Sequence, residues 1–476
     1  MTIELIIIGL YFVLLIVVGW LGKRLARTST DFLIAGRNLG VVLCTVSIAG
    51  EWIGGMSTVG TAEIAYSHGF FPAWYNISTA IGMMLFGFSL ASVYRKHNVH
   101  TVGEMLEKIY NKEVRIITSI CFAVAFLILA YLQLQTVGSI AAQVMKVDYS
   151  QAVIISGILI TLYVYFGGMH SIVLTNMVHF ILLYSVLITV FILVMIKVGG
   201  YSGLFENLEK VIGANGVKTF QNPFSLGIGK AVSWLVGGIL AGFASQASIQ
   251  PVFAAKDINT AKRSAIRSAL LIAPIGILVS TMAMAARTGL FGGQPPSVKE
   301  TLPYLMVNGN FLPSWLGGLA IAAILAAVLT TFAPVVFAAS TILTKDIYQR
   351  VINPNASDNR ILSVSTFLVV SIGLLSIPLA IFLKGAILDT AYITYAIRAS
   401  AAIVVLLGVY RVKKWIPSPT PRSVSAAMIT ASIASVVFVI YEKQIAQLLG
   451  FAVDKVYAAV FFTLVTIVVF LSKKRV

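Results

Sequence analysis

The chain has 476 residues, of which 58% are hydrophobic and 11% charged, and its mean hydropathy is +0.94. No ordinary globular domain could bury so much apolar surface, so the composition excludes one and indicates a polytopic membrane protein. The two cysteines, Cys44 and Cys121, both lie in apolar segments, so we expect packing residues rather than a disulfide framework or a metal cluster.

Hydrophobic runs long enough to cross a bilayer, at roughly 20 residues each, recur about thirteen times. The predicted spans are 3–22, 39–66, 69–94, 115–146, 150–167, 170–198, 227–253, 262–287, 313–344, 361–383, 386–411, 423–446 and 452–472. The first run, Ile3 to Leu21, has no small-residue cleavage site after it, so we expect a retained helix. The polar intervals 199–226 and 288–312 are expected to form ordered caps at most.

The net charge of +17 is distributed unevenly along the chain. When alternate loops are assigned to alternate sides of the membrane, most of the basic residues gather on one side; they include Lys23, Arg24, Arg95, Lys96, Arg263, Arg267, Arg411, Lys413 and the terminal Lys473-Lys474-Arg475. By the positive-inside rule, this predicts a plasma-membrane protein with its N-terminus outside and its C-terminus in the cytoplasm. The charge therefore does not indicate nucleic-acid binding.

Two of the apolar spans carry polar interruptions. The first lies between Thr45 and Gly55, and the second between Gly242 and Pro251. Polar groups and paired glycines at bilayer depth are costly unless the helix breaks there and faces a cavity, as in secondary transporters. Four spans separate the two interruptions, which predicts an inverted repeat of two five-helix halves. The expected division is 1–38 (leading helix and loop), 39–226 and 227–412 (the repeats), and 413–476 (two C-terminal helices and a basic tail).

A third polar segment holds adjacent hydroxyls in a later span. Ala327, Thr330 and Thr331 can offer one carbonyl and two hydroxyl oxygens from a single helix face, and hard cations such as sodium take several oxygen ligands. The alternative is that both hydroxyls bond back to carbonyls in their own turn. The broken helix favours the ion, because it exposes complementary carbonyls.

Together these segments resemble the sodium:solute symporter family, which has the inverted-repeat fold of the bacterial leucine transporter. The resemblance extends over nearly the whole chain and includes Ile48-x-x-Glu51-x-x-Gly54 ending in Met56-Ser57, Gly167-Gly168-Met169 with Thr175-Asn176, Phe253-Ala254-Ala255-Lys256, and Thr344-x-Asp346-Ile347-Tyr348. It implies one sodium ion, whose ligands are the carbonyls of Thr45, Ile48 and Ala327 and the hydroxyls of Thr330 and Thr331.

The chain also departs from the family pattern. Some members hold a second sodium with an aspartate in the fifth core helix and two further serines. This chain has Asn176, Ala333 and Pro334 there, so we expect one ion. Asn176 is expected to bond the eighth core helix instead.

The expected solute site combines residues of the two breaks with aromatic and ionisable residues nearby: Ser47, Glu51, Trp52, Phe70, Trp74, Ser245, Gln246, Asp389 and Arg398. Arg398 could fork onto a solute carboxylate, or it could pair with Glu51 or Asp389. Trp52 replaces a polar sugar-contacting residue of sugar-transporting relatives, which argues against a sugar. Phe70 and Trp74 could form an outer gate, or they could be interfacial anchors.

The sequence thus predicts an all-α sodium-coupled symporter that imports a small organic solute, with an amino acid or a carboxylate favoured. Proton coupling through Glu51 and a sugar or other neutral solute are the alternatives within transport. An intramembrane enzyme would need a nucleophile with a base or a metal cluster, and a sensor would need a soluble output domain; the sequence shows neither. The expected partners are the solute, sodium and the lipid bilayer, with no catalytic residues, no nucleic acid and no obligate protein partner.

Overall fold

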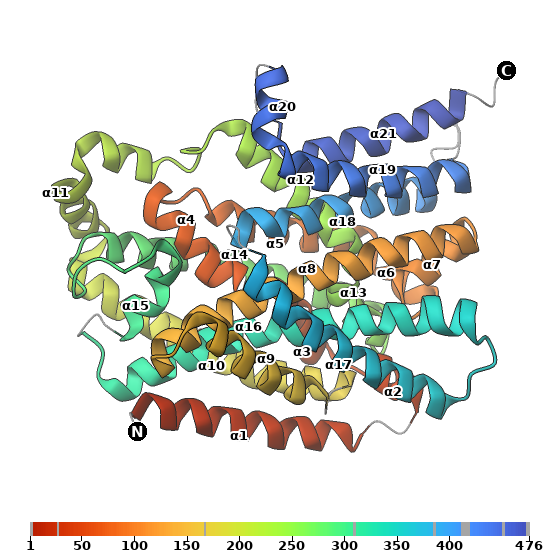
Figure 1. Ribbon diagram of the computed structural model, residues 1–476, viewed down its shortest axis with the longest axis horizontal. Helices are drawn as coiled ribbons and strands as arrows, with labels where there is room; N and C mark the ends of the chain where they lie inside the picture. Colours follow the sequence, from red (N-terminus) through yellow and green to blue (C-terminus); the bar gives the residue numbers. More distant parts are fainter. Residues whose placement is uncertain are drawn as a thin grey trace.

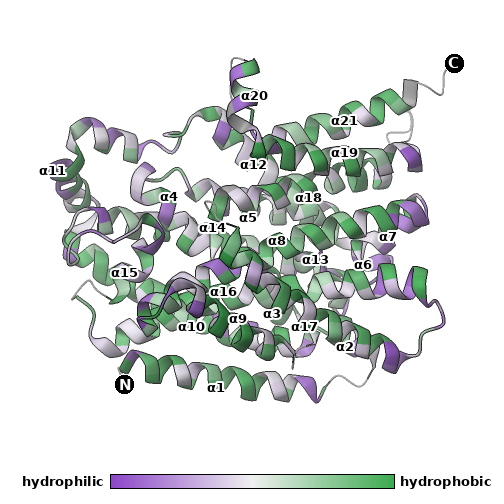
Figure 2. Cartoon of the chain, in the orientation of Figure 1, coloured by the Kyte–Doolittle hydropathy of each residue, from purple (hydrophilic) through white to green (hydrophobic). Residues whose placement is uncertain are grey.

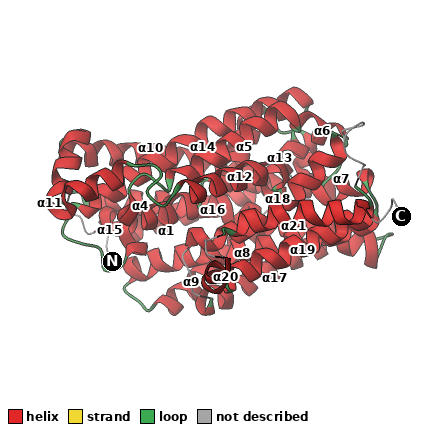
Figure 3. Ribbon diagram, turned by 90° about the horizontal axis from the view of Figure 1, so that it is seen from above, coloured by secondary structure: helices red, strands yellow, loops and turns green. Residues whose placement is uncertain are grey.

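The computed structural model describes residues 3–25, 28–165, 168–307, 311–383, 387–410, 419–449 and 453–472. Within these ranges the structure is built from helices and loops, and the one β-type pairing is an isolated bridge between Leu39 and Ala255 (Figure 3). The all-helical prediction is therefore confirmed for the described residues.

The helices pack side by side in a bundle, with α1 along one edge and α19 and α21 along the other (Figure 1). In chain order the helices are α1 (Ile3–Lys23), α2 (Ser29–Ile34), α3 (Val41–Trp52), α4 (Thr61–His68), α5 (Ala73–Ser89), α6 (Ala91–Lys96), α7 (Val102–Ile109), α8 (Lys112–Met145), α9 (Tyr149–Tyr165), α10 (Met169–Val198), α11 (Gly200–Gln221), α12 (Ile228–Ala244), α13 (Gln246–Ala254), α14 (Ile258–Arg287), α15 (Thr301–Val307), α16 (Ser314–Ile342), α17 (Asp358–Phe382), α18 (Ile387–Val409), α19 (Pro421–Ile440), α20 (Glu442–Leu449) and α21 (Lys455–Ser472). Short 3-10 or π segments are η1 (Ala35–Arg37), η2 (Met56–Gly60), η3 (Val298–Glu300) and η4 (Leu343–Ile352).

The length and composition of the helices match a protein that crosses the membrane many times. Among the described residues, nine helices are long and apolar enough to span, or ten if the bent pair of α3 and the 56–68 segment counts as one. Hydrophobic residues follow the middle of the bundle, and hydrophilic ones gather toward its ends (Figure 2). Every predicted span contains a helix, but α5, α9 and α21 fall outside those nine or ten. The total of about thirteen spans remains a prediction.

Helix α16 forms the centre of the bundle, because 94% of its spanning window is buried. Helix α1 is the opposite case: 22% of its window is buried, and it exposes a row of large apolar side chains, Leu10, Val13, Leu14 and Val17. An apolar exposed face of this length is the face that meets lipid. The residues of α16 therefore belong to the interior, where the candidate site lies.

Both polar interruptions are breaks in helices. Helix α3 ends at Trp52, the backbone of Ile53 leaves the helical region (φ −103°, ψ 73°), and the chain resumes at Met56 with a bend of 54°. The second break is a single extended residue, Ser245 (φ −75°, ψ 108°), between α12 and α13. The unwound part of the first break is thus confined to residues 53–55, at the C-terminal end of the predicted interval.

The two polar intervals contain helices that cap one end of the bundle (Figure 1). Helix α11 covers most of 199–226 with a kink at Gly213, and η3 and α15 lie within 288–312. The chain after α4 touches this cap closely: the amide of Phe70 donates to the carbonyl of Phe220 (3.1 Å). Gly69 has a φ of +63°, and a Cβ there would lie 2.1 Å from the same carbonyl oxygen. Only glycine fits this turn.

Candidate functional site

The hydroxyl of Thr330 joins α16 to the break in the first polar span. Its single proton is within reach of two acceptors: the carbonyl of Ile53 (2.9 Å), which the end of α3 leaves free, and the carbonyl of Ala327 one turn earlier in its own helix (2.7 Å). The bond to Ala327 is the local alternative expected for a helix hydroxyl. The bond to Ile53 is additional and crosses between helices that are far apart in sequence.

The neighbouring hydroxyl, that of Thr331, makes a second bridge to the same break. Its proton is shared between the carbonyls of Gly50 (2.9 Å) and Glu51 (3.1 Å). A Cβ at Gly54 would lie 2.2 Å from this hydroxyl oxygen, so the glycine permits the close approach of the two helices. With those of Thr330, these contacts gather six oxygens from α3, its break and α16, a number that suits a hard cation.

The two carbonyls predicted from the first broken helix differ from those observed at the hydroxyls. Thr45 and Ile48 lie inside α3, which continues to Trp52, and the Thr45 hydroxyl donates back to Val41 (2.7 Å). Only the last turn of a helix has carbonyls without intrahelical partners. The carbonyls of Gly50, Glu51 and Ile53 therefore face Thr330 and Thr331. Sodium ligation by the carbonyls of Thr45 and Ile48 stays a prediction.

Two buried amides lie beside this cluster of oxygens. The Asn176 amide of α10 lies so near Gly50 that a Cβ there would be 3.0 Å from its nitrogen, and neither amide atom has a hydrogen-bond partner within the described residues. The expected bond from Asn176 to α16 is therefore absent from this part of the structure. Gln133 of α8 accepts from the Gly55 amide (2.9 Å), and its nitrogen has no partner among these residues. Sequence reasoning missed Gln133, although a glutamine inside an apolar span is itself a signal.

The second cluster is a buried ion pair where three helices meet. Arg398 of α18 donates through Nη1 to Glu51 Oε1 (2.8 Å) and to the hydroxyl of Ser245 (2.9 Å). Ser245, at the second break, donates to the same carboxylate oxygen (3.0 Å). The alternative in which Arg398 pairs with Glu51 is thus observed. Asp389 was the other predicted partner, and its side chain lies outside the described part of the chain.

A cluster of buried aromatic side chains adjoins the ion pair. Its members are Trp52, Tyr75, Trp234, Tyr392 and Tyr395. The guanidinium carbon of Arg398 lies 4.5 Å from the centre of the Tyr395 ring and 5.2 Å from that of the Trp52 ring, both within range of a cation–π interaction. The Glu51–Arg398 pair is therefore walled by aromatic faces.

Three other predicted solute residues, Gln246, Phe70 and Trp74, make their contacts away from this pair. Gln246 is turned toward α7, where it accepts from the amide of Val102 (2.8 Å) and donates to the carbonyl of His100 (2.9 Å). Both ends of its amide are thus used in holding α13 to α7. Phe70 contacts the cap described above, and the indole of Trp74 donates to the carbonyl of Pro223 after α11 (2.9 Å). These two aromatics contact the cap at one end of the bundle rather than line the ion pair.

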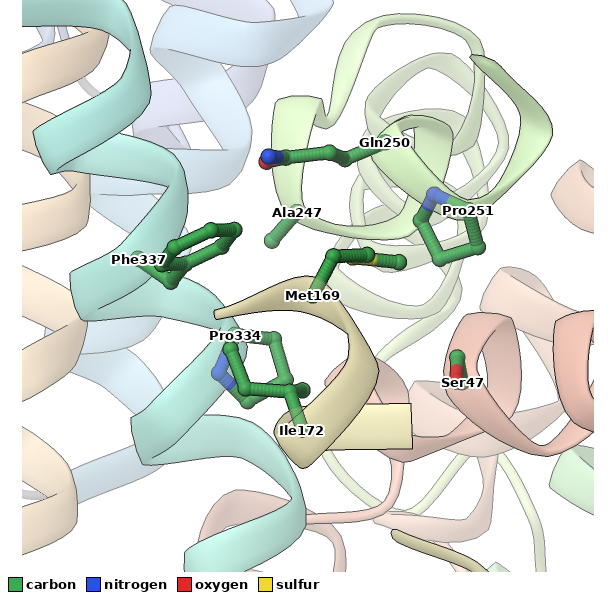
Figure 4. Close-up of a pocket in the computed structure, with 8 residues that line it drawn as sticks. All are labelled: Ser47, Met169, Ile172, Ala247, Gln250, Pro251, Pro334 and Phe337. Atoms are coloured by element: carbon green, nitrogen blue, oxygen red, sulfur yellow. The ribbon is translucent and has the colours of Figure 1, made fainter. Parts of the chain in front are cut away.

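Ser47, one turn before Glu51 on α3, borders a small cavity. The cavity lies between four helices and is lined by Ser47, Met169, Ile172, Ala247, Gln250, Pro251, Pro334 and Phe337 (Figure 4). The Ser47 hydroxyl has no hydrogen-bond partner within the described residues, and the Gln250 amide donates away from the cavity to Leu33 and Thr341. Neither Glu51 nor Arg398 is among the residues that line this cavity.

Comparison with known proteins identifies what this chain is similar to. A family model, the sodium:solute symporter family, matches residues 32–415. The sodium/glucose cotransporter of Vibrio parahaemolyticus is 24% identical, with 98% of this chain and 89% of that protein covered. The osmoregulated proline transporter OpuE of Bacillus subtilis is 23% identical, with 87% and 86% covered. A solved Na+-coupled sialic acid symporter, substrate-bound and outward-open, matches the fold with a TM-score of 0.80 at 19% identity, covering 98% of this chain and 96% of that one.

Proposed function

Because the chain belongs to the sodium:solute symporter family, and is thus a sodium-coupled multi-pass membrane transporter and not an enzyme, we propose that it imports a small amino acid or carboxylate by alternating access. The observation that carries this proposal is the contact of the Thr330 and Thr331 hydroxyls with the carbonyls freed at the break in α3. This contact joins a broken helix to the central helix of the bundle.

Sodium would bind among these oxygens. The ion would take the carbonyls of Gly50, Glu51, Ile53 and Ala327 together with the two threonine hydroxyls, whose oxygens act as acceptors once their protons turn away. Binding would then hold α3 to α16 more tightly than the hydroxyl bonds alone. Coupling follows if sodium has a higher affinity for the conformation that also binds the solute.

We propose one sodium ion per solute. A second sodium site would lack its side-chain ligands. Ala333 and Pro334 have no hydroxyl groups, and Asn176 has an amide where a carboxylate would be needed. Asn176 instead adds a polar amide at the edge of the first cage, where it would contribute orientation rather than charge.

The solute would bind between the two helix breaks, beside Arg398. Matching breaks at residues 53–55 and 245, and the fold shared with the sialic acid symporter, support an inverted repeat of residues 39–226 and 227–412 between the leading segment 1–38 and the C-terminal segment 413–476. The distribution of Lys and Arg supports a plasma-membrane protein with an outer N-terminus and a cytoplasmic C-terminus.

A second possibility within transport is proton coupling. Glu51 is buried, and its Oε2 has no hydrogen-bond partner within the described residues, so this carboxylate could take up a proton. The competing ions can be separated directly. Purified protein in proteoliposomes would be given an inward sodium gradient or an inward proton gradient, and uptake of labelled amino acids and carboxylates would be followed. Sodium-driven uptake supports the proposal, whereas uptake driven by protons alone contradicts it.

A further inference from the structure

The Glu51–Arg398 pair is joined through only one oxygen and one nitrogen. Glu51 Oε1 accepts from both Arg398 and Ser245, while Oε2 accepts from nothing within the described residues. An arginine and a carboxylate often form a bidentate pair, because two parallel hydrogen bonds satisfy both carboxylate oxygens. At 3% exposure of Glu51, a carboxylate oxygen without a hydrogen bond is costly.

The guanidinium of Arg398 also has an N–H donor that its described contacts do not use. Its Nε donates to the carbonyl of Thr394 (3.2 Å), its Nη1 makes the two bonds to Glu51 and Ser245, and its Nη2 makes one bond to the Thr394 hydroxyl (3.1 Å). Arginine carries five N–H donors, so one on Nη2 stays unused among the described contacts. The indole N–H of Trp52, also buried beside the pair, has no acceptor in the same part of the chain.

The aromatic rings around the Arg398 guanidinium indicate which groups could bind in its place. The rings of Tyr395 and Trp52 lie within cation–π range of the guanidinium, and the same faces would attract an ammonium group. The position therefore offers a carboxylate oxygen and ring faces to a cation, while Arg398 and the indole offer donors to an anion. These are the two ends of a zwitterion.

The charge balance of the Glu51–Arg398 pair disfavours solutes that are not zwitterions. Glu51 and Arg398 neutralise each other, so a solute with a net charge would leave one buried charge uncompensated. An uncharged solute could replace neither partner, and the ion pair would stay closed. A solute that carries both charges can separate the two side chains and compensate each of them.

We propose that the Glu51–Arg398 pair occupies the place of a zwitterionic solute, whose carboxylate binds Arg398 and the Trp52 indole, and whose ammonium group binds Glu51 Oε2 and the aromatic faces. This inference rests on the proposed transport function and narrows its solute to amino acids and betaines. When the solute leaves, the two side chains close on each other, which spares both charges from being buried alone.

The test uses full-length protein in proteoliposomes with an inward sodium gradient and two matched sets of probes. Glycine betaine, 3,3-dimethylbutyrate, choline and 3,3-dimethylbutanol share one shape but are zwitterionic, anionic, cationic and uncharged. L-Proline, cyclopentanecarboxylate, L-prolinol and cyclopentylmethanol form a second such set. A panel of other amino acids, organic acids and sugars extends the search to further shapes. We expect sodium-driven uptake of a zwitterion at least about tenfold above that of its isosteres, as expected for an unpaired buried charge.

Two variants then test the assignment of each end. Glu51→Gln should shift preference toward the anionic isostere, and Arg398→Gln toward the cationic one, each by at least about tenfold relative to the zwitterion. The exposed Glu206→Gln is the matched control and should keep wild-type preference. Equal weakening of all isosteres by both variants would overturn the assignment.

The wild-type measurement decides the proposal even if a variant fails to fold. Sodium-driven uptake of an anion, a cation or a sugar, with no uptake of any zwitterion, would overturn the inference and leave sodium symport intact. Uptake of any solute without dependence on sodium would instead overturn the proposed function.

Discussion

Replacing Thr331 by valine isolates the role of one oxygen in the proposed sodium cage. Valine keeps the branched shape of threonine but has no hydroxyl, and the site is fully buried. The substitution leaves the carbonyls of Gly50 and Glu51, now 2.9 and 3.1 Å from the hydroxyl, facing a methyl group. The matched control is Thr331→Ser, which keeps the oxygen and loses a methyl group.

The size of the effect follows from the contacts that are lost. A buried acceptor left without a partner costs about 1–3 kcal/mol. If the hydroxyl is also one of the sodium ligands, a comparable loss in binding energy weakens sodium affinity by about 5- to 150-fold. The serine control loses about 0.8 kcal/mol of apolar burial, which bears on folding stability rather than on the ion.

The assay is the sodium concentration that gives half-maximal solute uptake in proteoliposomes, together with the rise in melting temperature that sodium produces. A ligand that binds only the folded protein stabilises it according to its affinity, so both readouts should move together. We expect a large shift for Thr331→Val and a small one for Thr331→Ser. A folded Thr331→Val protein with wild-type sodium dependence would refute the cage.

Four further predictions concern other parts of the molecule. Gln246→Leu removes the amide contacts of α13 with His100 and Val102 at the start of α7, so labelling of a Ser47→Cys thiol by a membrane-impermeant reagent should rise. Gly69→Ala should lower the free energy of unfolding by roughly 1–3 kcal/mol, measured by denaturation, because its φ is +63° and the new Cβ meets a backbone oxygen. Burial raises the pKa of Glu104, but the hydrogen bond from the His100 backbone amide and the nearby His100 ring lower it by more, to about 2, so stability should fall as pH drops from about 4.5 through about 2. Reversal potentials should give one sodium per solute.

Each of these predictions has its own control. Gln444→Leu changes an exposed glutamine and should leave labelling unchanged, while Gly229→Ala adds a Cβ where nothing lies within 4 Å and should cost no stability. Glu104→Gln should remove its part of the acid dependence. Unchanged labelling in Gln246→Leu, a neutral Gly69→Ala, acid dependence that survives Glu104→Gln, or a coupling ratio of two would contradict the respective reasoning.

The sequence was sufficient for features that depend on local chemistry. Polar groups and glycines inside apolar runs located both helix breaks, and the spacing of Thr330 and Thr331 located the face of α16 that meets the first break. The exact carbonyls were not predictable, because the end of α3 depends on packing between helices. Gly54 lies against Thr331, and Gly55 lies against Gln133 and a threonine of α8.

The partners of long polar side chains were also beyond the sequence. Arg398 and Glu51 are 347 positions apart, and the sequence left their pairing as one of several alternatives. Gln246 is adjacent to Ser245, yet Ser245 bonds Glu51 of α3 while Gln246 bonds His100 before α7, on either side of the extended residue that separates α12 from α13. The partner of each such side chain depends on which helix packs against that side of the helix break.

The most direct test of the account is equilibrium binding of radioactive sodium to the purified protein. We predict saturable binding of one ion per chain, lost in a folded Thr330→Val/Thr331→Val protein and retained in Thr330→Ser/Thr331→Ser. Unchanged sodium binding by the folded double valine protein would contradict the claim that sodium joins the broken helix α3 to α16.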